Sequence, residues 1–282
     1  MSILNQMLKK YTINSSDDYF NAIREIFQEI ALAGLYRGNF YSKAAFYGGT
    51  ALRIFHGLDR FSEDMDFSLL EINDDFSLDP FLPYLKKEFS ALGIIVDLSI
   101  KEKKQHSNID SAFLKADSTV YQIGIEFENS EIIDIGRQVK IKLEVDKKPP
   151  LKFQTEDKLL LQPFSFYAKC FDLSSLFAGK MHALLFRNWK NRVKGRDWFD
   201  FEWYVRSNVP LNFNHFKERA FQSGHLVDYD SFTKKDLIEI LHAKIDELDI
   251  NLAKEDIIRF IEDDKKIEIW SKDYFHQIAG MI

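Results

Sequence analysis

One short segment, residues 46–67, constrains this chain more than any other. It predicts a strand that ends at a Gly-Gly-Thr turn, a short helix that starts at Thr50, and a second strand that carries the sequence Asp-Met-Asp. Alternation along the second strand puts Asp64 and Asp66 on one face and apolar side chains on the other. The segment therefore predicts a strand–turn–helix unit followed by a half-buried strand that presents two carboxylates on one face.

The Gly-Gly-Thr turn is a candidate phosphate site. Glycines let backbone N–H groups approach a phosphate closely, and the start of a helix adds partial positive charge, so Gly48, Gly49 and Thr50 are suited to holding a triphosphate. Taken alone, such a tripeptide is more often a tight turn with Thr50 as the helix N-cap. The phosphate interpretation therefore depends on the acidic pair that follows.

Asp64 and Asp66 are candidate metal ligands. Two carboxylates on one strand face can share a divalent cation, and Mg²⁺ or Mn²⁺ binds hard oxygen ligands together with substrate phosphates. Such a site suits nucleotidyl transfer when a third carboxylate comes from a neighbouring strand. Glu144 and Asp146 share one face of the predicted strand 138–146, so either can be the third, and we take Glu144 first. An isolated Asp-x-Asp pair is more often a solvated strand face, so the prediction rests on the combination.

Composition narrows the class of protein. The chain has 282 residues, 45% of them apolar, which is enough for one catalytic domain with an appended lobe. Its net charge of −6 argues against a protein that coats nucleic acid through bulk charge. The single cysteine, Cys170, cannot form an intramolecular disulfide, and no apolar run is long enough to span a bilayer. We therefore expect a cytoplasmic protein without a membrane partner.

The remaining pattern predicts an α+β fold. A helix is expected over 16–35 and another over 79–92, with strands over 93–101, 119–127 and 138–146. Six further helices are expected at 174–191, 197–207, 212–222, 234–247, 253–263 and 269–280. We accordingly expect two domains, a mixed sheet flanked by helices in residues 1–160 and a helical lobe in residues 161–282, with the boundary within 155–173.

The glycine turn and the acidic pair together resemble a known family. The sequence GGTALR followed by RFSEDMDF is similar to the first two motifs of AbiEii-type toxins, a branch of the DNA polymerase β-like nucleotidyltransferase superfamily. In that family a Ser-x-Asp-x-Asp motif follows the glycine motif, and it maps onto Ser62, Asp64 and Asp66. Arg53 and Arg60 fall where the family commonly has basic residues, which implies a place near phosphates, although exposed arginines often only aid solubility.

The family's remaining motifs, a lysine on one helix and an aspartate that opens another, match Lys180 and Asp197. Lys180 and Arg187 lie on one helix face, where they suit the β- and γ-phosphates of an NTP. Asp197 and Asp200 share a face of the next helix, and one of them would orient Lys180 or Arg187 or act as base toward the acceptor. Without the resemblance, Lys180 is typical of a surface lysine. Asp197 and Asp200 are then typical of acidic residues near the start of a helix, which the helix macrodipole favours. A basic cluster at 190–196 offers a patch for an RNA backbone, though such loops are usually only solvated.

The resemblance implies a polymerase β-like, NTP-dependent nucleotidyltransferase that is the toxin of a toxin–antitoxin or abortive-infection system. The residues it implies are Asp64, Asp66, Lys180 and Asp197 for catalysis, Gly48, Gly49, Thr50, Arg53, Ser62, Lys180 and Arg187 for NTP binding, and Asp64, Asp66 and Glu144 for the metal. Some family members modify tRNA acceptor ends, so tRNA is the favoured acceptor and an antitoxin protein the expected partner. The alternatives are a non-catalytic NTP- or RNA-binding protein of the same fold, which the intact acids disfavour, and a nucleotide-sugar glycosyltransferase, which would not need the upstream Gly-Gly-Thr helix.

Overall fold

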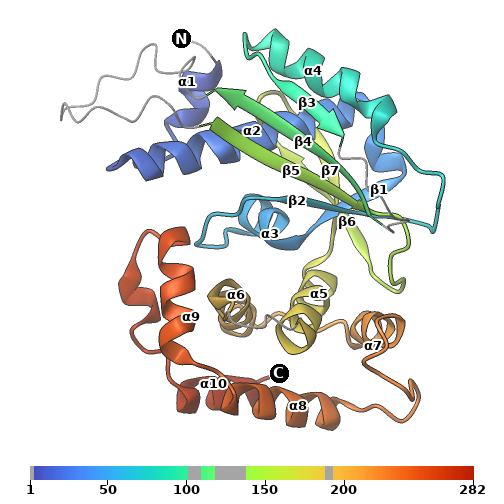
Figure 1. Cartoon of the computed structure of the whole chain (residues 1–282), viewed down its shortest axis with the longest axis vertical. Coiled ribbons are helices and arrows are strands. Elements are labelled where there is room, and N and C mark those ends of the chain that lie inside the picture. The colour runs from blue at the N-terminus through green and yellow to red at the C-terminus, as the bar shows by residue number, and fades with distance from the viewer. Residues whose placement is uncertain (1–2, 101–108, 118–137, 188–192) are drawn as a thin grey trace. The chain divides into compact units, whose positions relative to one another are not determined.

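The computed structural model of the chain describes residues 3–100, 109–117, 138–187 and 193–282 (Figure 1). The chain divides into two compact units. The sheet unit contains Met1–Thr50, Ser62–Pro149 and Asp157–Cys170, and the helical unit contains Ala51–Phe61, Pro150–Glu156 and Phe171–Ile282. The sequence predicts a sheet domain before a helical one with a single boundary after residue 160. The chain instead enters the helical unit at 51–61 and at 150–156 before it stays there from residue 171.

Within the described residues, seven strands form one mixed sheet in the order β3-β4-β5-β2-β1-β7-β6. Strand β2 lies between β1, to which it is antiparallel, and β5, to which it is parallel. The strands are β1 (Ala44–Tyr47), β2 (Met65–Leu69), β3 (Asp97–Ile100), β4 (Ile109–Asp117), β5 (Gln138–Asp146), β6 (Thr155–Leu160) and β7 (Phe166–Phe171). The mixed sheet confirms the α+β class, and β2 and β5 confirm two predicted strands. The strand predicted at 119–127 lies outside the described residues.

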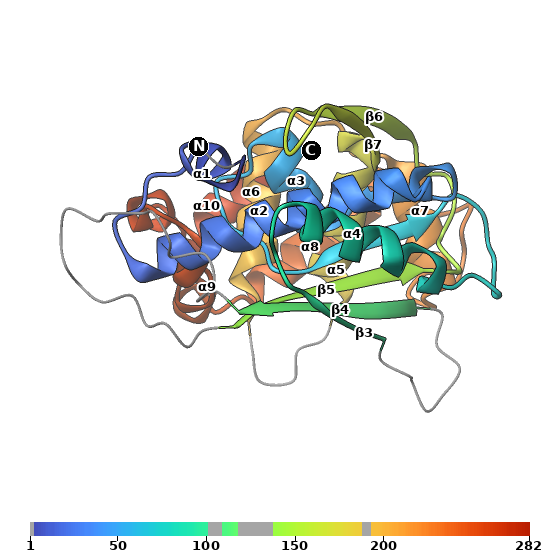
Figure 2. The same ribbon diagram turned by 90° about the horizontal axis from the view of Figure 1, so that it is seen from above.

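Helix α2 (Ser16–Arg37) runs beside the sheet and packs against β5 and against α4 (Leu82–Ala91) (Figure 2). The hydroxyl of Ser15 accepts a hydrogen bond from the backbone of the first turn, which explains why α2 starts there. Gly34 lets α4 approach closely, because a Cβ atom at Gly34 would lie 3.0 Å from the Cα atom of Leu85. The sheet unit also contains α1 (Ile3–Leu8) and the first turn of α3 (Gly48–His56).

The helical unit confirms all six helices predicted in the second half of the chain, with shifted ends. Most of them start where a side chain accepts a hydrogen bond from the first turn, as Asp249 does for α9, which begins three residues before the predicted start. The helices are α5 (Leu173–Phe186), α6 (Gly195–Arg206), α7 (Phe213–Gln222), α8 (Lys234–Asp246), α9 (Ile250–Ile257) and α10 (Lys272–Ala279). Across the described ranges, no helix is both long enough and apolar enough to cross a bilayer.

His215, in the first turn of α7, is a buried histidine that stays neutral in the folded helical unit. Its Nδ1 donates to the carbonyl oxygen of Leu151 at 2.8 Å, and its Nε2 is buried without a hydrogen-bond partner among the described residues. The rings of Phe153 and Phe171 pack edge-on against the imidazole. Burial, and then the charge of Arg219, lower the pKa of His215 to about 4.

We expect His215 to make the helical unit less stable as the pH falls from 6.5 toward 4. In this window the unfolded histidine binds a proton and the folded one does not, so acidification favours the unfolded state, by about 2 kcal/mol between pH 7 and pH 5. A His215→Gln variant keeps an N–H donor but cannot titrate, so it should lose correspondingly less stability over this range. Urea unfolding of both proteins at the two pH values measures the difference, and equal losses would contradict the assignment.

Candidate active site

The glycine turn holds its shape because of Gly48. Helix α3 begins at Gly48, directly after β1 and two residues before the predicted start. Gly48 has φ +84°, which favours glycine, and a Cβ atom there would lie 2.5 Å from Oδ2 of Asp66. Both the backbone turn and the position of the Asp66 carboxylate therefore require a residue without a side chain. The hydroxyl of Thr50 donates to the backbone carbonyl of Asp64, which ties the turn to the residue before β2.

The strand register determines which carboxylates are neighbours. Asp66 on β2 is the direct register partner of Glu144 on the parallel strand β5, whereas Asp146 pairs with Ser68. Residues in register on strands about 4.8 Å apart point to the same face of the sheet, so Asp66 and Glu144 are neighbours on one face and are called the carboxylate pair below. Glu144 also forms an ion pair with Lys142, 2.6 Å away on the same strand. The register thus favours Glu144 over Asp146, a choice that alternation along β5 could not make.

The Asp66–Glu144 pair suits a hard divalent cation. Mg²⁺ is usually held by one or two protein carboxylates, with waters and substrate phosphates as its remaining ligands. In the part of the chain that the structure describes, no three carboxylate, histidine or cysteine side chains are grouped as ligands of one metal ion. Asp64 precedes β2 and is exposed, while Asp66 is half-buried. A two-carboxylate arrangement therefore fits these residues, and Asp64 as a further ligand stays a prediction.

The entry to β2 is fixed by a residue that the sequence pattern did not single out. Gln28 on α2 is 1% exposed, and its amide nitrogen donates to the carbonyl oxygens of Ser62 at 3.0 Å and Glu63 at 3.1 Å. These bonds hold the backbone of the Ser-x-Asp-x-Asp motif from the helix behind it. The signal in the sequence is a polar residue within the apolar stripe of α2.

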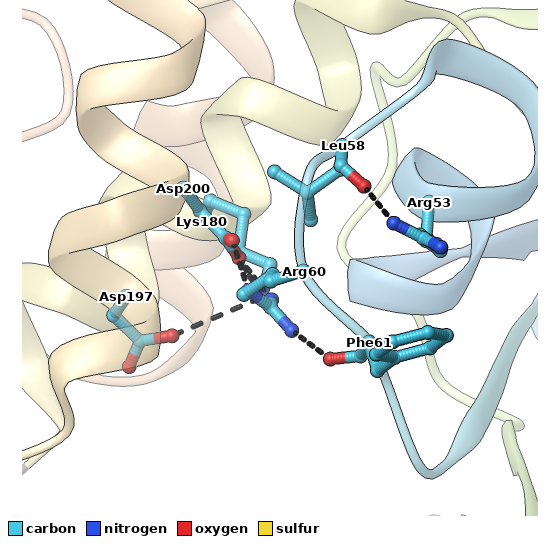
Figure 3. Close-up of polar contacts among 7 residues, drawn as sticks. All are labelled: Arg53, Leu58, Arg60, Phe61, Lys180, Asp197 and Asp200. Atoms are coloured by element: carbon cyan, nitrogen blue, oxygen red, sulfur yellow. Dashed lines mark hydrogen bonds and ion pairs between the residues drawn. The ribbon is translucent and has the colours of Figure 1, made fainter. Parts of the chain in front are cut away.

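In the helical unit, the buried residues Arg60, Asp197 and Asp200 and the partly buried Lys180 form a charged cluster, called the buried charged cluster below (Figure 3). The amine of Lys180 lies 2.6 Å from Oδ2 of Asp200 and 3.8 Å from Oδ1 of Asp197. Arg60 donates to both carboxylate oxygens of Asp200, through Nε and Nη2, at 2.6 Å each. The sequence predicts that either Asp197 or Asp200 orients Lys180 or Arg187, and Asp200 is the closer partner of Lys180.

Both members of the Arg60–Asp200 pair stay charged although they are buried, at 2% and 0% exposure. Burial raises the pKa of Asp200, but the charges of Arg60 and Lys180 and their hydrogen bonds outweigh it and hold the pKa below its usual value. Burial lowers the pKa of Arg60, and the Asp200 carboxylate more than compensates. Arg60 is thus a structural residue of this unit, contrary to the expectation that it lies near phosphates.

The two other predicted arginines take different positions in the helical unit. Arg53 donates through Nη1 to the carbonyl oxygen of Leu58 at 3.0 Å, and its guanidinium lies 4.4 Å from the centre of the Phe61 ring (Figure 3). It therefore holds the loop that follows α3. Arg187 is exposed at the C-terminal cap of α5. The cluster predicted at 190–196 lies partly outside the described residues, and Lys194 within it is the N-cap of α6.

We expect Gly48→Ala to lower activity more than it lowers stability. The positive φ costs about 1–2 kcal/mol in any L-residue, and the new Cβ atom also pushes the Asp66 carboxylate away. A displacement of about 1 Å at reacting groups can reduce a rate by about 10²-fold. Gly93→Ala is the matched control, because Gly93 also has positive φ but its Cβ atom would meet nothing within 4 Å. Assays and melting curves of both variants separate backbone strain from displacement, and equal activities would contradict this account.

The mixed sheet, the glycine turn and the carboxylate pair beside it are the arrangement that the sequence predicts for a nucleotidyltransferase. A family profile described as the nucleotidyl transferase AbiEii toxin of a type IV toxin–antitoxin system matches residues 30–278, so the chain belongs to this family. The resemblance found in the motifs is therefore confirmed, as is the enzyme class. Membership also implies an NTP substrate and a cognate antitoxin. A search of curated proteins finds no match.

The chain is also similar to solved structures. The nucleotidyltransferase toxin MenT4, Rv2826c, from Mycobacterium tuberculosis H37Rv is similar with a TM-score of 0.59 and 13% identity, over 99% of this chain and 88% of that chain. JHP933 from Helicobacter pylori matches with a TM-score of 0.49 and 19% identity, over 92% of this chain and 88% of that chain. At these identities the similarity to MenT4 establishes the fold alone.

Proposed function

We propose that this toxin-family nucleotidyltransferase moves a nucleoside monophosphate from an NTP to an RNA, with tRNA the favoured acceptor and with Mg²⁺ or Mn²⁺ bound. The observation that carries the proposal is the register pairing of Asp66 with Glu144, at a turn where Gly48 leaves room for the Asp66 carboxylate. Carboxylates on adjacent strands, beside the start of a helix, provide places for a metal and for phosphates. The glycosyltransferase alternative has no such observation in its favour.

Asp66 and Glu144, with Asp64 as the third predicted ligand, would hold the metal. When bound, the metal supplies a Lewis acid for the α-phosphate and offsets charge on the departing pyrophosphate. The backbone N–H groups of Gly48 and Gly49 at the start of α3 would hold the triphosphate. The acceptor hydroxyl oxygen forms a bond to the α-phosphorus, the bond from that phosphorus to pyrophosphate breaks, and the hydroxyl proton passes to a carboxylate base.

Lys180 and Asp197 are proposed as the phosphate ligand and the acceptor base of the helical unit. The side chain of Lys180 is 17% exposed and its amine lies 2.6 Å from Asp200, so the charge is held in position in a side chain that is only partly buried. A fixed cation of this kind stabilises charge that develops on a phosphate without reorganising first. The side chain of Asp197 is 6% exposed and lies beside the same amine.

The proposed setting is the cytoplasm, where NTPs and tRNA are available. Cys170 is buried and is the single cysteine of the sequence, so the chain forms no intramolecular disulfide, which is consistent with a reducing compartment. The expected protein partner is the cognate antitoxin that membership of a type IV toxin–antitoxin family implies.

The test is to incubate the purified protein with total bacterial tRNA, Mg²⁺ and each α-labelled NTP in turn, beside an Asp64→Ala/Asp66→Ala double variant. Label on RNA that requires both aspartates supports the proposal and identifies the nucleotide. Label on another acceptor in a cell extract would reject RNA but keep the reaction. NTP binding without transfer to any acceptor would favour the non-catalytic alternative.

A further inference from the structure

The ends of three helices of the helical unit surround a small pocket of about 170 Å³. It is lined by Arg187 after α5, by Lys194 and Asp197 at the start of α6, and by Lys244 near the end of α8. Three cationic side chains from three separate elements therefore share one space. Because the Asp197 carboxylate lies 3.8 Å from the amine of Lys180, the pocket adjoins the buried charged cluster.

Lys194 is an unfavourable N-cap for α6. A good N-cap accepts a hydrogen bond from the first turn, and the start of a helix carries partial positive charge that repels a lysine. Helix α6 has no side-chain cap. The neighbouring helices α5, α7, α8, α9 and α10 are each capped by such an acceptor, namely Asp172, Asn212, Thr233, Asp249 and Ser271. Among helices α5 to α10, α6 alone starts without a side-chain cap, which suggests that Lys194 serves binding and not helix stability.

The charges around Lys194 support the same reading. Burial lowers the pKa of Lys194; Asp197 raises it, and the nearby cations Arg187, Lys180 and Arg196 lower it further. The chain therefore keeps a partly buried lysine among other cations at the positive end of a helix. Glu247, which also lines the pocket, lies 3.5 Å from Lys244 but has a side chain that is 73% exposed, so it neutralises Lys244 weakly. A bound anion would relieve this repulsion.

We propose that this pocket is a phosphate-binding site formed by Arg187, Lys194 and Lys244. The inference rests on the proposed nucleotidyl transfer and deepens it, since both the NTP and an RNA acceptor carry phosphates. The volume is small beside the roughly 300–1,000 Å³ of sites that enclose a whole small molecule, so the pocket takes a single phosphate group and not an entire nucleotide. Arginine and lysine are the usual partners of such a group.

The experiment compares Lys194→Ser, Lys244→Gln and the double variant with the wild-type protein. The first arm measures binding of a fluorescent RNA hairpin with a single-stranded 3′ end at several salt concentrations, without NTP. The second arm measures binding of labelled NTP with Mg²⁺, without RNA. If only RNA binding weakens, by about tenfold for each lost cation and with a shallower salt dependence, the pocket binds the acceptor. Weakening in the second arm alone assigns it to the triphosphate.

Lys194→Ser gives a readout that a purely structural residue would not give. Serine is a good N-cap, so the variant should melt about 2 °C higher than the wild type while it binds phosphate more weakly. Lys235→Gln is the matched control, because Lys235 lies on α8 with its side chain 85% exposed and does not line the pocket. Its binding should equal that of the wild type in both arms.

Wild-type binding of both RNA and NTP by the double variant would overturn the proposal. Neither arm requires turnover, so the site is tested even if the protein transfers nothing to RNA. Conversely, transfer to RNA by the wild type together with unchanged binding by the variants would reject the pocket and leave the proposed function standing.

Discussion

Replacing Asp66 with asparagine is expected to lower nucleotidyl transfer by about 10³-fold or more, equivalent to about 4 kcal/mol of transition-state stabilisation. The amide keeps the size of the side chain but removes the charge that the Asp66–Glu144 pair would offer a cation. Stability should change by only about 0.5 kcal/mol, because Asp66 is half-buried and its removal relieves repulsion from Glu144. Initial rates at saturating NTP and Mg²⁺, beside melting curves, measure both effects.

The control for this variant is Glu71→Gln. Glu71 is an exposed acid just beyond the end of β2, so its replacement removes one negative charge from the same unit without touching the carboxylate pair. Its activity should stay within a factor of about two of the wild type, since a surface charge of this kind is weakly coupled to distant groups. Asp66→Asn with a rate within tenfold of the wild type would exclude Asp66 from the catalytic centre.

The sequence predicted those parts of the fold whose pattern is local. Helix α2 and the helices of the second half have apolar stripes with recognisable caps, and the sequences of β2 and β5 alternate between apolar and polar residues. Strand β6 was not predicted, because its residues alternate only between exposed and half-exposed positions and therefore form no apolar face. A polar edge strand has the composition of a loop, and only its hydrogen bonds to β7 distinguish it.

In the candidate site, too, the local pattern predicts less than the contacts between elements determine. Alternation put Glu144 and Asp146 on one face of β5, but only the register with β2 determines which is the neighbour of Asp66. In the same way, Asp197 and Asp200 share one face of α6, and the packing of α5 against α6 determines which of them meets Lys180. Spacing along one element thus predicts which residues share a face, whereas contacts between elements depend on long-range packing.

Breaking the buried pair of Arg60 and Asp200 is expected to destabilise the helical unit by roughly 3–5 kcal/mol. Arg60→Met leaves the Asp200 carboxylate with Lys180 alone, and Asp200→Leu leaves the guanidinium of Arg60 buried without its acid. Urea unfolding followed by tryptophan fluorescence reports on this unit, because every tryptophan of the sequence falls within Phe171–Ile282.

Arg206→Met provides the matched comparison within the same unit. Arg206 lies 3.8 Å from Asp59 with both side chains largely exposed, at 57% and 43%, so its loss should cost less than about 1 kcal/mol. The double variant Arg60→Met/Asp200→Leu should lose much less stability than the sum of the losses of the two single variants. Both charges of the pair are then replaced by apolar side chains, so neither is left buried without the other. Additive losses, or an Arg60→Met variant as stable as Arg206→Met, would mean that the guanidinium does not depend on Asp200. Arg60 would then be available for the phosphate contact that the motif resemblance first implied.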